Sequence, residues 1–544
     1  MKKIATLLLA AGLVFGAATG ASAIDFKAKG QWIMSFDYGQ NGTFVGKENG
    51  HKKTGWGDGK QDDFEARQRV RLQLDAVASE SLSGTVYFEI GDSIWGQNSS
   101  GGALGADGKI VELKQAYIDW MAPETDLKVR MGIQNITTPA YASGNSVLND
   151  DVAGVVASYQ INEMAGVTAF WARPYNDNFT GFNDANGHKN WRANYMDNMD
   201  AVGLLVPLSF DGAKVTPWGM YAGIGPNTFR LSQKDAEKRD ADGKLLPQTY
   251  TNDWYGNLAN MGAGNGFINS GLFPVGGARH RDFSNANGRA VGGRNLSSYA
   301  NAWWGGVSAD ITIWDPFRVA FDFEYGSVTW EDDGRLNRQG WFATLLAEYK
   351  LDWAIPGIYG WYASGDDSNP ANGSERMPTM DGNNTNKYSN FAFDGDPYIA
   401  RDAVVGHSMA GTWGIGARLK DMSFIEDLKH TFRVNYIGGT NSTTMAKKMS
   451  KAGLWANGDD LGGFEGWSGG HDALYLTTGD SALEFGLSNY YKMYDNFTIS
   501  LEADYIALWL DTSKSAWGAR HKEGKSIPQT KDAWNINASF VYSF

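Results

Sequence analysis

Three arginines at every second position offer the clearest chemistry in this sequence. They are Arg67, Arg69 and Arg71, and single uncharged residues separate them. Successive side chains of an extended strand point to opposite faces, so the three guanidinium groups share one face. An arginine facing lipid costs about 2 to 4 kcal/mol at the bilayer midplane of a membrane strand, so this face must contact water.

Fixed positive charge of this kind attracts and orients the acidic end of a passing solute. Lys128 and Arg130 have the same two-residue spacing and extend the basic face. A second interpretation is that the basic residues form a structural lining, paired with acids such as Glu65 and Glu89. Both interpretations stay open, and the sequence predicts pore-lining roles for Arg67, Arg69, Arg71, Lys128 and Arg130.

Acids that could oppose the arginines occur in the connection 137–152, which contains Asp150 and Asp151. If this connection folds into a lumen, the two acids would face the basic wall across a constriction. If it stays outside, they are solvated loop residues. The outward face of the arginine strand carries Ala66 and Gln68, which are poor lipid contacts, and this indicates a subunit interface.

The elements that position these residues are alternating segments of about ten residues. Apolar and polar positions alternate in 317–325, 497–505 and 534–544. Short turns near 122–124, 314–316 and 494–496 contrast with long Gly/Asn/Asp-rich connections near 226–297, 365–407 and 440–480. A soluble β-sandwich also alternates, but short turns at one end and long loops at the other are typical of a membrane barrel.

We therefore expect an all-β fold, a transmembrane antiparallel β-barrel of about 18 strands, with 16 as the alternative. The prediction gives it short periplasmic turns, long extracellular loops and both termini on the short-turn side. The weakly negative mean hydropathy, −0.38, does not argue against this, because strands that alternate hide their apolar face from a sliding window.

The N-terminus has the order of a secretory signal peptide: a basic start, an apolar run and Ala21-Ser22-Ala23. A membrane anchor is the alternative, but the run is shorter than the ~20 residues of a spanning helix. We expect residues 1–23 to be removed and 24–544 to form a single barrel.

Composition excludes several function classes. The chain has no cysteine, which removes disulfides and thiolate metal sites, and its net charge of −13 argues against nucleic acid as a partner. It contains neither a His-Glu-x-x-His nor a Gly-x-Ser-x-Gly pattern. We predict no catalytic residues, no cofactor and no metal, and interpret loop acids such as Asp366 and Asp367 as solvated, with calcium binding as the rival.

The segments Leu113–Tyr117 and Leu127–Gln134 resemble the fourth and fifth strands of Gram-negative trimeric porins, and the end Tyr542-Ser543-Phe544 resembles their assembly signal. Over its length the chain is most similar to the outer-membrane homotrimeric porins of sulfate-reducing bacteria. One departure is that 137–152 lacks the Pro-Glu-Phe-type acidic stretch of enterobacterial porins, which leaves the constriction acids open.

The resemblance implies a homotrimer in the Gram-negative outer membrane, a third loop folded inward and passive diffusion of small hydrophilic solutes and ions. It also implies lipid and lipopolysaccharide around the barrel, and assembly machinery that reads Tyr542 and Phe544. The rivals are a channel selective for sugars or organic acids and, from another class, a barrel enzyme or adhesin.

Overall fold

The computed structural model describes most of the chain from residue 24 onwards. Described are residues 24–42, 44, 64–98, 101–105, 111–176, 182–183, 189–190, 198–225, 271–272, 298–331, 334–369, 371–380, 387–393, 398–399, 403–451, 474–511 and 531–544. The expected signal peptide, 1–23, and nearly all of 226–297 lie outside the described residues. Within the described part, no helix is long and apolar enough to cross a membrane.

The strands form one antiparallel sheet that closes on itself. Each strand of the wall pairs with its neighbours in chain order, and β21 (Ala533–Ser543) pairs with β1 (Asp25–Gln40). Both β10 (Asn198–Leu205) and β11 (Leu208–Phe210) pair with β12 (Ala213–Ile224), so they count as one interrupted strand. The described residues thus build a closed barrel of 18 strands. The prediction of about 18 strands is confirmed, and the alternative of 16 is wrong.

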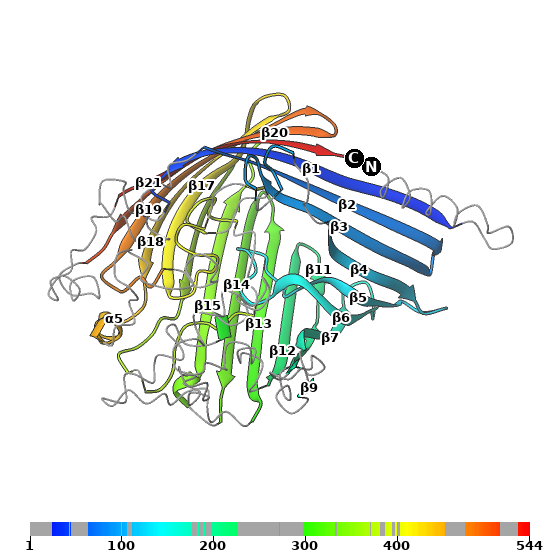
Figure 1. The fold of residues 1–544 in the computed structure, drawn as a ribbon, viewed down its shortest axis with the longest axis horizontal. Helices are drawn as coiled ribbons and strands as arrows, with labels where there is room; N and C mark the ends of the chain where they lie inside the picture. Colours follow the sequence, from blue (N-terminus) through cyan, green and yellow to red (C-terminus); the bar gives the residue numbers. More distant parts are fainter. Residues whose placement is uncertain are drawn as a thin grey trace.

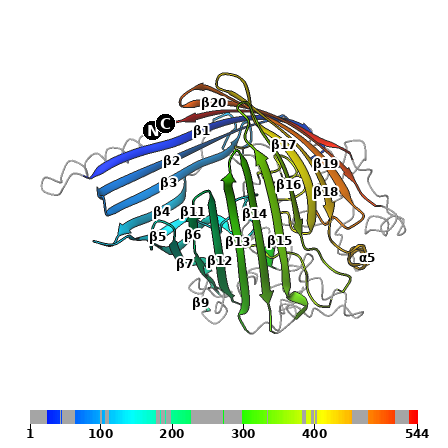
Figure 2. The same cartoon turned by 180° about the vertical axis from the view of Figure 1, so that it is seen from behind.

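Figures 1 and 2 show this wall curving from the blue strands β1 and β2 through the green strands to β21, which lies beside β1. The remaining wall strands are β2 (Glu65–Ser79), β3 (Leu82–Ile94), β4 (Glu112–Met121), β5 (Leu127–Thr137), β6 (Asn149–Gln160), β7 (Gly166–Asn176), β13 (Ala300–Trp314), β14 (Phe317–Thr329), β15 (Arg338–Tyr349), β16 (Ile355–Ala363), β17 (Thr412–Ile425), β18 (Leu428–Gly439), β19 (Ser481–Tyr494) and β20 (Phe497–Trp509). Elements outside the wall are β8 (Phe182–Asn183), β9 (Lys189–Asn190), the 3-10 helix η5 (Gly334–Leu336) and α5 (Thr443–Lys451).

The alternating sequence pattern separates the two faces of the wall. On β14, Phe323 and Tyr325 are 44% and 45% exposed on the outer face, whereas Asp322 and Glu324 are 1% and 0% exposed on the inner face. An apolar outer face suits hydrocarbon, and an inner face of charged groups needs water or hydrogen-bond partners. The alternation predicted for 317–325 is therefore the division between the outside and the inside of the barrel.

The two ends of the barrel differ as predicted. At one end the links are short, at 80–81, 122–126, 161–165, 211–212, 315–316, 350–354, 426–427 and 495–496, and the chain enters β1 and leaves β21 at the same end. At the other end lie the long connections, among them 364–411 between β16 and β17 and 440–480 between β18 and β19. We call these the short-turn end and the long-loop end.

One long connection is not external, contrary to our expectation for 365–407. Its residues Tyr388, Phe391 and Phe393 are fully buried inside the barrel. The Phe393 ring packs edge-on against the lumen-facing Trp361, at 5.9 Å between centroids. The sequence hid this because the connection is rich in Gly, Asn and Asp, and its few apolar residues find their partners only on strands distant in sequence.

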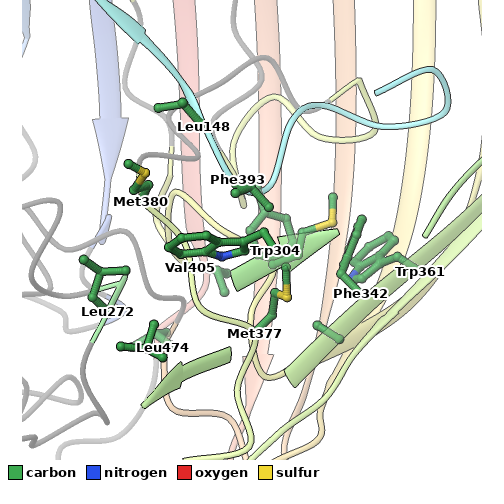
Figure 3. Packing of buried hydrophobic residues seen from close by; sticks show 14 of the residues in the cluster. Leu148, Leu272, Trp304, Phe342, Trp361, Met377, Met380, Phe393, Val405 and Leu474 are labelled. Carbon is green, nitrogen blue, oxygen red and sulfur yellow. The ribbon is translucent and has the colours of Figure 1, made fainter. Parts of the chain in front are cut away.

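The buried side chains of these connections meet those of the wall in one apolar core (Figure 3). Trp304, Phe342 and Trp361 come from the wall, and Met377, Met380, Phe393 and Val405 come from the connection 364–411. Leu148, Leu272 and Leu474 join from three other connections, so the few described residues of 226–297 and of 452–480 also contribute. The core lies within the lumen, and it fills part of the cross-section.

Candidate functional site

The β2 arginines point into the barrel. In the pairing of β1 with β2, Arg67 lies opposite Ser35 and Arg69 lies opposite Ile33. Ser35 and Ile33 are buried on the inner face. Because paired residues share a face, Arg67, Arg69 and Arg71 line the lumen, as their spacing predicts.

Each of these arginines has an acidic partner. Arg69 donates two hydrogen bonds to the carboxylate of Asp92 on β3, at 2.7 and 2.8 Å. Arg71 donates to Glu89 on the same strand at 2.6 Å, and Arg67 donates to Glu65 of its own strand. This geometry supports the second of the two interpretations, in which the basic residues form a structural lining paired with acids.

The second basic pair follows the same rule. Arg130 on β5 donates two hydrogen bonds to Asp119 on β4, at 2.7 and 2.8 Å, and lies 4.0 Å above the centre of the Tyr117 ring. Lys128 is 3.3 Å from the same carboxylate. Asp92 and Asp119 were missed in the sequence, although Asp119 lies on the polar side of its own alternating segment.

The acids proposed for the constriction lie elsewhere. Asp150 and Asp151 belong to β6, and the connection that precedes them comprises only residues 138–148. Asp151 contacts Lys114 at 2.8 Å and accepts a hydrogen bond from the amide of Gln115 at 2.6 Å, both on β4. Its place is therefore in the wall beside β5, because the strand begins earlier than the sequence boundary suggested.

The connection 138–148 does fold into the lumen, where Asp322 of β14 holds it. The Asp322 carboxylate accepts hydrogen bonds from the backbone N–H groups of Tyr141, Ala142 and Ser143, at 2.7, 2.9 and 3.1 Å. Charge-assisted bonds of this kind are about twice as strong as neutral ones. Asp322 is thus the wall acid that binds this loop, and the only sequence signal for it was its place on the polar face of 317–325.

Accessibility divides the inner wall into two parts. The side chains of Arg67, Arg71 and Arg130 are 23%, 27% and 31% exposed. The lumen-facing aromatic residues Trp304 and Trp361 are only 3% and 4% exposed, because the core of Figure 3 covers them. A solute inside the barrel can thus touch the ion pairs of β2–β5, which we call the charged wall; Arg318 of β14, paired with Asp310, is accessible to a similar degree, at 30%.

The C-terminal residues close the seam between β21 and β1. The backbone N–H of Phe544 donates to the carbonyl of Gly30 at 3.0 Å, and the N–H of Gly30 donates to the carbonyl of Phe544 at 2.7 Å. The Phe544 ring lies so close to Gly30 that a Cβ there would be 2.5 Å from it, which only glycine permits. Tyr542 and Phe544 stay exposed on the outer face.

In the described part of the chain, no group of three or more His, Asp or Glu side chains is arranged to hold a metal ion. Asp366 instead accepts hydrogen bonds from the hydroxyls of Ser374 and Tyr475 at 2.5 and 2.7 Å, and it is buried rather than solvated. The interpretation of Asp366 as a solvated loop acid was wrong.

The sequence matches no protein-family model, and no curated protein matches it either. Among solved structures, the chain is similar to the outer membrane protein OprD of Pseudomonas aeruginosa, with 10% identity, a TM-score of 0.47 and coverage of 97% of this chain and 95% of that one. It is also similar to a BenF-like porin from Pseudomonas fluorescens Pf-5, with 7% identity, a TM-score of 0.48 and coverage of 96% and 98%. A third is OpdK of Pseudomonas aeruginosa, solved with vanillate, with 8% identity, a TM-score of 0.44 and coverage of 95% and 98%. The assignment as a barrel rests on the strand pairing of this chain itself.

Proposed function

We propose that this chain is an outer-membrane porin, a water-filled channel for the passive diffusion of small hydrophilic solutes and ions. The observation that carries the proposal is the charged wall, whose ion pairs stay accessible inside a barrel with an apolar outer face. Charged positions toward the lumen and apolar positions toward lipid, on the same strands, are the arrangement of a membrane channel.

The solutes that fit this wall carry charge. Guanidinium groups such as Arg71 and Arg130 are within reach of a solute, whereas aromatic rings such as Trp361 are covered. Sugars bind on exposed aromatic rings, and carboxylates bind to guanidinium groups through paired hydrogen bonds. If the channel is selective, this favours organic acids over sugars as the preferred class.

We place the short-turn end in the periplasm and the long-loop end outside the cell, with lipid and lipopolysaccharide around the barrel. Exposed aromatic residues near the short-turn end, among them Trp314, Trp353 and Tyr494, support contact with a membrane interface. Tyr542 and Phe544 are exposed on the outer face, where the barrel-assembly machinery can bind them during closure of the barrel. Membership in the homotrimeric porins of sulfate-reducing bacteria stays a prediction.

The proposal includes a homotrimer, with strands β1–β5 as the interface. The outward Ala66 is already buried within the single chain, and the indole N–H of Trp95 in the same chain donates to the Gln68 amide oxygen at 3.3 Å. These two positions are thus no longer evidence for an interface. Support comes instead from an apolar concavity of about 740 Å³ on the outer face nearer the short-turn end, lined by Ala28, Leu74, Ala76, Gly84 and Ile118 among others.

Planar-bilayer recording of the purified protein tests the proposed function. We expect large stepwise conductances, with current block by small carboxylates at concentrations where neutral sugars of similar size leave the current unchanged. Block by sugars alone would exclude the preference for organic acids, and the proposed channel function would still stand. Absence of stepwise conductance would exclude the porin and favour the enzyme or adhesin.

A further inference from the structure

One stretch of the connection between β16 and β17 lies inside the lumen, across the inner wall from β16 to the seam. We call its described residues 387–393, 398–399 and 403–405 the cross-lumen segment. Near its start, Tyr388 stacks on the lumen-facing Tyr359 of β16, with ring centroids 4.0 Å apart and planes 6° from parallel. Further along, Ile399 packs against Ile33 of β1 and Val541 of β21. The segment therefore reaches from the β16 wall to the seam of the barrel.

A single wall carboxylate, Glu484 of β19, holds the middle of this segment. Its Oε1 accepts hydrogen bonds from the hydroxyl of Ser389 at 2.7 Å and from the backbone N–H groups of Phe391 and Ala392 at 3.1 and 3.0 Å. Glu484 is only 2% exposed, so water cannot replace it as an acceptor. Buried N–H groups without an acceptor are costly, so the carboxylate strongly favours this position of the segment.

Neighbouring side chains complete the attachment. The Asn435 amide donates to the other oxygen of Glu484, Oε2, at 2.7 Å and to the carbonyl of Tyr388 at 2.8 Å. Asn390 donates to the hydroxyl of Ser488 at 2.6 Å. The wall side chains that make these contacts bind the segment, so their polar groups are not available to solutes.

We infer that Glu484 is a positioning residue that keeps the cross-lumen segment in the passage, and that this segment, in addition to the connection 138–148, limits the flow of ions. The inference rests on the proposed function, because it concerns the width of the same passage. It assigns to the connection 364–411 a constricting role that its sequence did not predict.

Single-channel conductance of Glu484→Ala tests the inference. Removal of the carboxylate leaves three buried donors of the segment and the Asn435 amide without this acceptor, so the segment should leave the passage. Because flow depends on pore diameter, we expect conductance to rise about twofold or more and larger sugars to enter proteoliposomes. The matched control is Asp37→Ala on β1, which removes a buried carboxylate of the inner wall that accepts a hydrogen bond from the wall residue Asn535 at 3.0 Å. Conductance of this control should stay at the wild-type value.

A reversible lock separates segment movement from damage to the wall. The chain has no cysteine, so Asn390→Cys with Ser488→Cys gives one reactive pair at side chains that already touch. In the Glu484→Ala background, oxidation should return the conductance to the wild-type value and reduction should raise it again. If Glu484→Ala fails to insert, Ser389→Ala with Asn390→Ala weakens the same attachment from the segment side and should raise conductance.

The outcomes distinguish the two proposals. A wild-type protein that gives no stepwise conductance contradicts the proposed function. If the wild type conducts but Glu484→Ala leaves the conductance unchanged, or if Asp37→Ala raises it equally, the inference is overturned while the proposed channel function stands.

Discussion

At the residue scale, the ion pairs of the charged wall decide which charge the passage presents. Arg71 and Glu89 neutralise each other across β2 and β3. Arg71→Gln leaves one carboxylate facing the lumen, and a unit charge about 4 Å from an ion in water is worth ~1 kcal/mol. We expect a several-fold shift of the permeability ratio toward cations, measured as the reversal potential in a salt gradient.

The double variant Arg71→Gln with Glu89→Gln is the control for this pair, because it removes both charges and keeps the shape. It should return the reversal potential to the wild-type value. Folded yield should be unchanged in both variants. A reversal potential that does not respond to Arg71→Gln would mean that permeating ions do not pass along the charged wall.

Glu375 makes a second prediction at this scale, in the connection 364–411. Burial, and then the charges of Asp366 and Asp367, raise the pKa of Glu375 to about 7, against the effect of the Asp367 N–H that donates to it at 2.9 Å. A raised pKa means that the folded segment binds the proton more tightly than the unfolded one. Its stability is therefore greatest below the ordinary pKa of about 4.5 and falls as the pH rises through 7.

Hydrogen exchange of residues 364–376 measures this. We expect faster exchange at pH 8.5 than at pH 5.5, after correction for the intrinsic pH dependence of exchange. Glu375→Gln should show no such difference. Equal pH responses in the two proteins would show that Glu375 does not control the segment.

At the element scale, β21 is the strand that closes the barrel. Deletion of Phe544 removes two backbone hydrogen bonds to Gly30 and the ring that covers it. Without these bonds the edge of β1 stays unpaired at this point of the seam. We therefore expect the yield of folded barrel in outer-membrane fractions to fall several-fold. Heat-modifiable mobility on gels measures the folded fraction.

Phe424→Ala is the matched control for that deletion, because it removes an exposed aromatic side chain that also lies at the short-turn end, on β17. Its folded yield should equal the wild-type yield. A similar loss in both variants would assign the effect of Phe544 to general membrane anchoring rather than to closure or assembly.

At the scale of the whole molecule, the outer concavity over β1–β5 predicts how copies associate. Ala76→Trp fills it and should convert the proposed trimer to monomers, because shape complementarity at an interface does not tolerate an indole in place of a methyl group. Light scattering after size-exclusion chromatography in detergent measures the mass. Ala417→Trp, on the exposed face of β17, should leave the trimer intact, and a trimer that persists in Ala76→Trp would place the interface elsewhere.

The sequence by itself determined which residues lie on each face of the barrel wall. Period-two alternation is a local property of each strand, so 317–325 and 534–544 predicted which residues face lipid, and the same rule placed Arg67, Arg69 and Arg71 inside. Link lengths predicted the two ends, and an approximate strand count followed. Glu65 and Glu89 were foreseen as partners of the arginines because they lie on the same or the next alternating segment.

Only the tertiary structure decided what fills the lumen. The connections carry no periodic pattern, and their partners are far away in sequence: Glu484 holds Phe391 and Ala392, and Asp322 holds Tyr141. The sequence pattern around an inner-wall carboxylate is the same whether its partner is water, an arginine or a backbone N–H. Barrel closure brings these groups together, and it thereby decides that the basic residues are paired and that two connections narrow the passage.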